Sequence, residues 1–199
     1  MGAGILPTTI HNNKLYFLFG RENQFEKSAP GFSDFGGGTD NNESYLETAI
    51  REGGEELTGF LGNDEELKTL LEKHGTYNID IPSGKNKIYR VHIFPMEYDE
   101  KLPFYYNNNQ RFLQKRLDQE IIKKSKIFEK EEIRWIPINE LNSMKLQFRF
   151  FFPPVIDKIN NEREKIKNFI KKGLGITTKK FVQRKDKTRK TRKNYKKLY

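Results

Sequence analysis

Short apolar runs alternate along the chain with stretches in which apolar residues recur every three or four positions. The first pattern is typical of buried strands and the second of helices that cover a sheet. Residues 3–20 fit a strand pair joined by the polar turn His11-Asn12-Asn13, with Leu15–Phe19 as its more apolar strand. The other runs predict strands at 77–82, 87–98 and 132–137, and helices at 44–57, 64–74, 110–125 and 155–172.

The ends and buried faces of these helices are also predicted. Ser44 and Glu47 have the spacing of a capping box, which opens a helix, and Gly75 and Gly173 are typical helix stops. The expected buried faces are Leu67, Leu70 and Leu71 in the second helix, Phe112, Leu113, Leu117, Ile121 and Ile122 in the third, and Val155, Ile159, Ile166 and Ile170 in the last. Residues 27–42 are rich in Gly, Ser, Asp and Asn and are expected to form a loop. Strands that alternate with flanking helices predict an α/β (or α+β) sandwich with a mixed central sheet.

The net charge of +10 is confined to the C-terminal end of the chain. Residues 179–199 hold eleven of the 37 Lys and Arg residues and one of the 27 acids, so the rest of the chain holds 26 of each sign. A chain of 199 residues suits one domain of ordinary size. We therefore expect a neutral domain over residues 1–175 and a basic low-complexity tail over 176–199 that is disordered on its own.

Composition excludes several classes of protein. The sequence has no cysteine, which rules out disulfides, thiolate metal sites and a cysteine nucleophile. No apolar run approaches the ~18–20 residues of a membrane-spanning helix, and the first residues lack the basic and apolar segments of a signal peptide. We expect a protein of the reducing cytoplasm that does not bind membranes. The nucleus is the alternative, since a basic tail can also be a targeting signal.

Three glutamates stand out in the helix expected at 44–57. At about 100° per residue, Glu52, Glu55 and Glu56 fall within roughly 100° of one another. Carboxylates this close repel one another unless a cation lies between them. Oxygen ligands without a neighbouring Cys or His cluster favour Mg²⁺ or Mn²⁺ over Zn²⁺. Taken alone, the same pattern also fits a solvated acidic helix face.

The residues around these glutamates resemble the Nudix box. That motif runs Gly, five residues, Glu, seven residues, Arg-Glu, an apolar residue, any residue, Glu-Glu, any residue, Gly and an apolar residue. The sequence matches it in register at Gly37, Glu43, Arg51, Glu52, Glu55 and Glu56. It departs twice, because Gly53 stands in the apolar slot and the closing glycine is Gly59, one residue late. Each glycine inside a helix costs roughly 1 kcal/mol, so we expect a locally weak or closely packed helix.

The resemblance covers about residues 3–172 and implies a Nudix-type α/β/α sandwich with a role for each matching residue. Glu52 and Glu56 would be the principal ligands of Mg²⁺ or Mn²⁺, with Glu55 close by and the Gly37 carbonyl contributing. Arg51 would hold the carboxylates in place through charge-assisted hydrogen bonds. The metal would neutralise a diphosphate and activate the attacking water.

Two further sets of residues are candidates for the site. A general base outside the box would come from the acids before the strand at 132–137, which are Glu129, Glu131 and Glu132. The alternative is that these are surface charges and that the base lies in the box itself. Aromatic side chains that could stack on a nucleobase are Tyr89, Phe104, Tyr105 and Tyr106, with ordinary packing as the simpler interpretation.

These observations predict a metal-dependent hydrolase that cleaves a pyrophosphate linkage in a nucleoside diphosphate-linked substrate. The RNA 5′ cap is the first substrate hypothesis, because a basic tail suits a polyanion, and the tail is also similar to those of many large-DNA-virus proteins. Small diphosphates (a dinucleoside polyphosphate, a nucleotide sugar or an inositol pyrophosphate) are the alternative, as is a non-catalytic module that binds RNA or nucleotides. The tail residues expected to contact RNA are Lys185, Lys187, Arg189, Lys190, Arg192 and Lys193.

Overall fold

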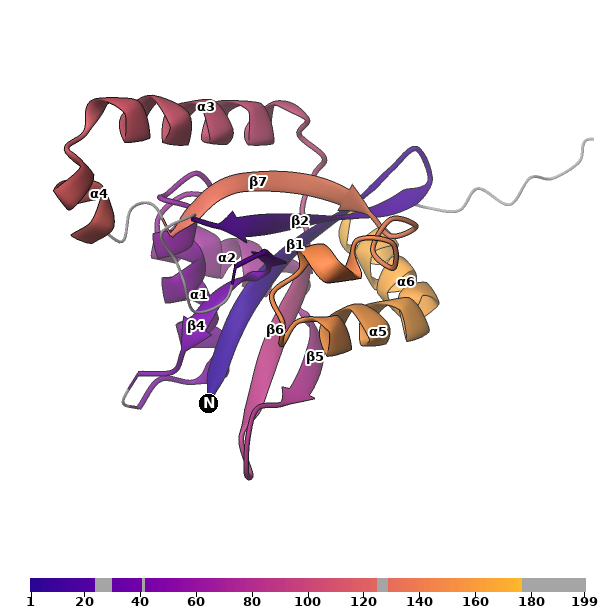
Figure 1. Cartoon of the computed structure of the whole chain (residues 1–199). Helices are drawn as coiled ribbons and strands as arrows, with labels where there is room; N and C mark the ends of the chain where they lie inside the picture. The colour runs from indigo at the N-terminus through magenta and orange to yellow at the C-terminus, as the bar shows by residue number, and fades with distance from the viewer. Residues whose placement is uncertain (24–29, 41, 125–128, 177–199) are drawn as a thin grey trace, which may run out of the picture.

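A computed structural model describes residues 1–23, 30–40, 42–124 and 129–176 (Figure 1). Its strands form one sheet and are β1 (Gly2–His11), β2 (Lys14–Glu22), β3 (Phe32–Ser33), β4 (Phe35–Gly38), β5 (Tyr77–Pro82), β6 (Ile88–Pro95) and β7 (Lys130–Pro137). Its helices are α1 (Tyr45–Glu56), α2 (Asp64–His74), α3 (Lys101–Arg116), α4 (Gln119–Lys124), α5 (Pro153–Asn161) and α6 (Arg163–Gly173), with a short 3₁₀ turn, η2 (Lys145–Gln147).

The sheet is built around β1, whose first eight residues are all buried. This strand pairs antiparallel with β2 and β4 and parallel with β6. On one side β5 continues the sheet beyond β6, and on the other β2 pairs with both β3 and β7. A sheet that contains both orientations is mixed, so the predicted mixed α/β class is confirmed.

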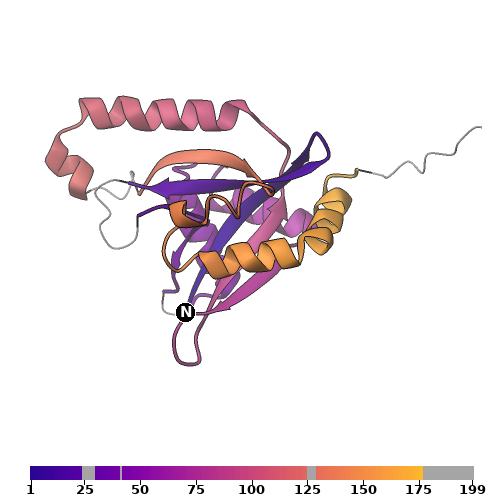
Figure 2. The ribbon, with the colours of Figure 1, turned by 45° about the vertical axis from the view of Figure 1, so that its right-hand side comes forward.

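Helices cover both faces of the sheet, as Figures 1 and 2 show from two directions. On β2, Phe17 and Phe19 join the core beneath α5 and α6, whereas Leu18 between them joins the core beneath α1 and α2. This alternation follows from the two-residue period of a strand. None of the helices in the described part of the chain has both the length and the apolar composition of a membrane span.

Several predicted elements agree with the structure. The turn between the first two strands uses positive φ at Asn12 and Asn13, and the second helix has the predicted bounds with Gly75 as its C-cap. The predicted final helix is two helices, because the chain breaks at Glu162. Its predicted buried face is nevertheless confirmed, since the four isoleucine and valine side chains are all buried: Val155, Ile159, Ile166 and Ile170.

Two predictions were wrong. The segment expected to be a loop contains the short strands β3 and β4, and β4 pairs with β1. The helix expected at 110–125 begins instead at Lys101, and it breaks at Leu117, where the backbone is extended. Its predicted apolar face is wrong in part, because Phe112 and Ile121 are 59% and 53% exposed, whereas Ile122 is buried.

Polar contacts explain the true position of α3. The Asn107 side chain donates to the Ile133 carbonyl at 3.1 Å and accepts from the Ile133 N–H at 2.8 Å, as a neighbouring strand would. This amide pairs with β7 on the edge that β2 leaves open. The first half of α3 is therefore held on the sheet, while its far end and α4 project beyond the sheet in both views (Figures 1 and 2).

Candidate active site

Helix α1 is fixed at its start by a capping box and along its length by close contact with β1. The Ser44 side chain accepts from the Glu47 N–H, and the Glu47 carboxylate accepts from the Ser44 N–H. A Cβ atom at Gly53 would lie 2.4 Å from Cδ1 of Ile5 on β1. A larger apolar residue therefore has no room here, and Gly53 allows the helix to lie closer to the sheet.

The extra residue of the motif is absorbed where α1 ends. The helix stops at Glu56, with Leu57 as its C-cap. Both Thr58 (φ +50°) and Gly59 (φ +75°) are left-handed, and the Gly59 N–H donates to the Gly54 carbonyl at 3.3 Å. Neither departure from the motif displaces its charged residues.

A solvent-facing group of charges, the outer cluster, consists of Glu43, Arg51, Glu52 and Glu55. Arg51 donates from Nε and Nη2 to the two oxygens of Glu43 at 2.8 and 3.1 Å, and from Nη1 to Glu52 at 2.9 Å. The same Nη1 lies 3.8 Å from Glu55. Hydrogen bonding to Arg51 lowers the pKa of Glu43 to about 2. One guanidinium thus holds three carboxylates on one side of α1.

Glycine at position 37 is required by the outer cluster. A Cβ atom there would lie 2.5 Å from the carboxyl carbon of Glu52 and from both of its oxygens. The neighbouring Gly38 carbonyl accepts from Arg51 Nη2 at 3.0 Å. The backbone of β4 is therefore pressed against the Glu52 carboxylate, where a side chain would prevent the contact.

A second group, the inner cluster, consists of Glu22, Glu56, Lys130 and Arg149. Glu56 is only 4% exposed and Lys130 is 0% exposed, and Nζ of Lys130 lies 3.2 Å from Oε1 of Glu56. The other oxygen of Glu56 accepts from the Gly36 N–H at 2.9 Å. Lys130 also donates to Glu22, and Arg149 donates to the same Glu22 oxygen at 2.7 Å. Glu22, Glu56 and Lys130 are thus packed together away from water, and Arg149 joins them from the partly exposed side.

The inner cluster shifts the ionisation of its members. Burial raises the pKa of Glu56 well above its ordinary value, although the positive charge of Lys130 opposes the shift. Burial alone would lower the pKa of Lys130, but the charges of Glu56 and Glu22 outweigh it and the pKa is raised. Lys130 is therefore an ammonium ion at neutral pH.

Asp34 lies beside this cluster and forms a pair with Tyr89. The Tyr89 hydroxyl donates to Asp34 Oδ1 at 3.0 Å and is 3.1 Å from Oδ2. Burial raises the pKa of Asp34 to about 7, against the opposing charge of Lys130. Cβ atoms at Gly4 and Gly36 would lie 2.5 and 2.4 Å from the Asp34 and Tyr89 oxygens, so two glycines make room for the pair.

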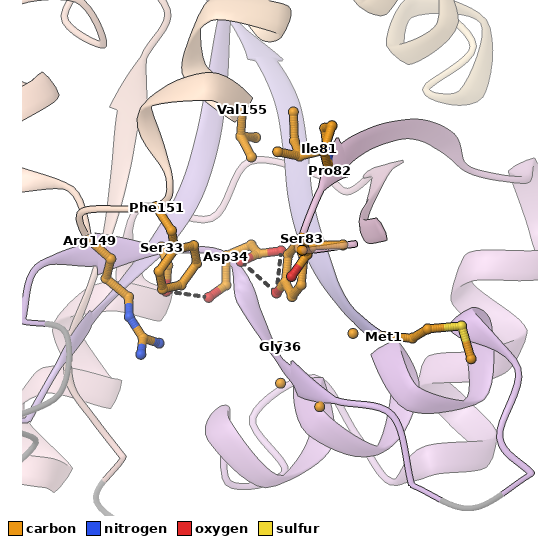
Figure 3. Close-up of a pocket in the computed structure, with 15 residues that line it drawn as sticks. Met1, Ser33, Asp34, Gly36, Ile81, Pro82, Ser83, Arg149, Phe151 and Val155 are labelled. Carbon is orange, nitrogen blue, oxygen red and sulfur yellow. Dashed lines mark hydrogen bonds between the residues drawn. The ribbon is translucent and has the colours of Figure 1, made fainter. Parts of the chain in front are cut away.

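A cavity of about 450 Å³ opens beside these residues (Figure 3). Its lining residues include Gly36–Gly38, Asp34 and Tyr89. Phe151 and Arg149 come from the segment after η2. Arg149 lies 4.9 Å above the Phe151 ring, so a positive charge and an aromatic face are presented together. The cavity therefore combines apolar walls with a few polar groups, as small-molecule sites do.

The predicted substrate and base residues are distributed more widely. Tyr89 lines the cavity, whereas Phe104 and Tyr105 lie on the exposed face of α3 and are not among the lining residues. Glu131 and Glu132 pair with Arg21 of β2 at 3.1 and 2.7 Å. The backbone carbonyl of Glu129 accepts a hydrogen bond from the Asn23 N–H at 2.8 Å. The basic residues predicted in the tail, Lys185 to Lys193, lie outside the described residues.

The sequence analysis missed four charged residues of the site: Glu22, Asp34, Lys130 and Arg149. Each is a single charged residue without a motif around it. Lys130 stands among three glutamates in the sequence, and the local pattern attributes no role to it.

The residues present can be compared with those that a divalent cation needs. Within residues 1–23, 30–40, 42–124 and 129–176, no group of three or more Asp, Glu or His side chains is arranged to hold a metal ion. Mg²⁺ is commonly held by one or two carboxylates together with substrate phosphates and water. Glu52 and Glu55, which meet at Arg51 Nη1, fit that requirement. Glu56 fits it less well, because it is only 4% exposed and its two oxygens already contact the Gly36 N–H and the buried Lys130 ammonium.

No protein-family model and no curated protein matches the chain. Solved structures that resemble it include a Nudix hydrolase from M. smegmatis, RenU, with 12% identity, covering 83% of this chain and 86% of that one at a TM-score of 0.47. The NUDIX domain of Shewanella oneidensis NrtR with ADP ribose has 14% identity, 81% and 86% coverage and a TM-score of 0.46. A C. elegans Ap4A hydrolase binary complex has 15% identity, 87% and 96% coverage and a TM-score of 0.41. At these identities and TM-scores, the likenesses assign neither a family nor an activity to the chain.

Proposed function

We propose that this protein is a metal-dependent hydrolase that cleaves a pyrophosphate linkage in a nucleoside diphosphate-linked substrate. The observation that carries the proposal is the outer cluster. Arg51 holds Glu52 and Glu55 together, and Glu52 is pressed against Gly37 at the edge of the cavity. A motif of the Nudix type thus keeps its charged residues in register despite its two departures.

The cluster supplies preorganised charge for substitution at phosphorus. Glu52 and Glu55 would hold Mg²⁺ or Mn²⁺, which neutralises a diphosphate and activates water when bound. Arg51 keeps Glu52 in one orientation, so this carboxylate does not have to be ordered during the reaction. Arg149, at the cavity, offers a further positive charge to a phosphate. The general base stays a prediction, either an acid among Glu129, Glu131 and Glu132 or a carboxylate of the box.

The cavity suits the group attached to the diphosphate. Its volume of about 450 Å³ is within the range of small-molecule sites. Phe151 and Tyr89 provide aromatic surfaces, and Asp34 provides a hydrogen-bonding group beside them. A nucleoside matches this combination of stacking and polar contact. The RNA 5′ cap is the first substrate within this class, and small diphosphates are the alternative.

A substrate panel tests the proposal. Purified protein with Mg²⁺ or Mn²⁺ is incubated with capped RNA, a dinucleoside polyphosphate, a nucleotide sugar and an inositol pyrophosphate, and the products are separated by chromatography. We expect one class to be cleaved between phosphates. Glu52→Gln should lower kcat by at least about 10²-fold, because it removes one charge of the cation site. Glu65→Gln, an exposed acid of α2, is the matched control and should be fully active.

Full activity of Glu52→Gln would exclude the outer cluster from the reaction. Binding of a nucleotide without turnover would instead favour the non-catalytic module. The two departures at Gly53 and Gly59 motivated that alternative in the sequence, and contacts with Ile5 and the helix end account for both.

The basic tail is proposed to capture RNA, on the basis of its sequence alone. Deletion of residues 179–199 removes eleven Lys and Arg side chains from a chain that is otherwise neutral. Each contacted phosphate of a single strand contributes about −0.7 to the slope of log K against log salt. If four tail residues contact RNA, the intact protein should show a slope of about −3 that disappears on deletion. For capped RNA, KM should rise with little change in kcat, and for a dinucleotide neither should change. Equal effects on both substrates would contradict RNA capture by the tail.

A further inference from the structure

The inner cluster contains a cation of its own at the place where the motif would put a metal. We infer that the Lys130 ammonium is a built-in counter-ion for Glu56, so that the site loads a single divalent cation, held by Glu52 and Glu55. This inference rests on the proposed function and specifies the metal content of that same site.

Both oxygens of the buried Glu56 already have a protein partner. One oxygen accepts from the Gly36 N–H at 2.9 Å, and the other lies 3.2 Å from Lys130 Nζ. A divalent ion bound to that second oxygen at about 2.1 Å would lie no more than about 5 Å from the ammonium. Two like charges at that separation, in a place closed to water, repel each other strongly.

The charges of the inner cluster are already balanced without a metal. In their ionised forms, Glu22 and Glu56 contribute two negative charges, and Lys130 and Arg149 contribute two positive ones. Adding a divalent ion would leave two positive charges in excess around three side chains that are almost fully buried, Glu22, Glu56 and Lys130. The cluster is therefore complete as an ion network.

Lys130 is held in place by the backbone around it. The Tyr106 hydroxyl is 2.8 Å from the Glu56 carbonyl and 3.2 Å from the Lys130 carbonyl, so α3 ties the two backbones together. A Cβ atom at Gly20 would lie 2.9 Å from Lys130 Cδ, so this glycine makes room for the lysine side chain. Its ammonium also donates to Ser33 Oγ at 3.0 Å. The contact with Glu56 is thus set by the fold.

The outer cluster also contains a cation, since Arg51 Nη1 lies 2.9 Å from one oxygen of Glu52, but this cation is itself partly exposed. The side chain of Glu55 is 41% exposed, and its nearest cation, Arg51, is 3.8 Å away. A hydrated divalent ion can approach Glu55 and Glu52 from solvent and keep several of its waters, as Mg²⁺ prefers.

The test measures Mn²⁺ binding to the full-length protein in the absence of substrate, by calorimetry and by the spin resonance signal of free Mn²⁺. We expect one Mn²⁺ per chain for the natural sequence. Glu52→Gln should weaken binding by at least about tenfold, because it removes a ligand charge. Glu56→Gln should leave the affinity within about twofold, because its oxygens do not hold the ion.

Several outcomes would overturn the inference. A second Mn²⁺ that is lost in Glu56→Gln, or equal losses of affinity in Glu56→Gln and Glu52→Gln, would place a metal on Glu56 and leave the proposed hydrolase intact. Absence of Mn²⁺ binding altogether would overturn both the inference and the proposed function.

Lys130→Met provides an independent test. If this variant is folded by circular dichroism, we expect it to bind a second Mn²⁺, because Glu22 and Glu56 have lost their shared cation. The double variant Lys130→Met/Glu56→Gln should return to one ion. A folded Lys130→Met protein that still binds a single Mn²⁺ contradicts the inference. If Lys130→Met does not fold, the comparison of Glu56→Gln with Glu52→Gln decides.

Discussion

The outer and inner clusters both take glutamates from α1 and pair them with cations, but they differ in their access to water. In the outer cluster, Arg51 lowers the pKa of Glu43 to about 2, so the acid stays ionised. In the inner cluster, burial raises the pKa of Glu56 well above its ordinary value. The difference shows that one motif can place two of its glutamates, Glu43 and Glu56, in opposite electrostatic environments.

The two clusters should also contribute differently to stability. Ion pairs near the surface contribute about 0–1 kcal/mol, because water screens the charges and the side chains lose entropy. Removing one partner of a buried ion pair costs about 3–5 kcal/mol, because the remaining charge is left without compensation. The outer cluster should thus contribute little to stability, and the inner cluster is suited to holding β2, β7 and α1 together.

The largest expected effect is that of Lys130→Met on the free energy of unfolding. Methionine keeps an unbranched side chain but removes the charge, so Glu22 and Glu56 lose the ammonium between them. We expect a loss of about 3–5 kcal/mol, measured by urea denaturation at pH 7. The matched variant Arg51→Met should lose about 1 kcal/mol or less, because its partners are partly exposed.

Equal losses in these two variants would remove the distinction between the clusters. A larger loss in Arg51→Met would reverse it and make the outer cluster the structural one.

The outer cluster and α1 could be predicted from the sequence because all the necessary information is local. The capping box at Ser44 and Glu47 and the helical spacing of the glutamates involve neighbours within a few residues. The same local method placed α3 wrongly. There the position of the helix depends on Asn107 and the distant edge of β7.

The inner cluster could not be predicted, because its members meet only through the pairing of the sheet. Glu22 and Lys130 are 108 residues apart and become neighbours through the β2–β7 register, next to a shift at Arg21 and Glu22. Arg149 is 127 residues from Glu22. A one-residue change of register would turn Lys130 to the other face of the sheet, and no local pattern fixes that register.

A further effect on stability concerns Asp34, and its dependence on pH sharpens the comparison between the two clusters. Its pKa is raised to about 7 in the folded protein from an ordinary value of 3.8. Below pH 3.8 both the folded and the unfolded chain hold the proton, so the stabilising contribution of the neutral acid is fully present. As the pH rises to about 7, the unfolded chain releases the proton first and stability is lost, by up to about 4 kcal/mol.

Asp34→Asn should remove this loss, because an amide stays neutral and its oxygen can still accept from the Tyr89 hydroxyl. Urea denaturation across this pH range should show the variant gaining stability relative to the natural protein as pH rises. Glu43→Gln is the control from the outer cluster and has the opposite sign. Its stabilising contribution is present above pH 4.5 and is lost as the pH falls to about 2. A difference between Asp34→Asn and the natural protein that stays constant with pH would mean that Asp34 ionises normally and that water reaches the inner cluster.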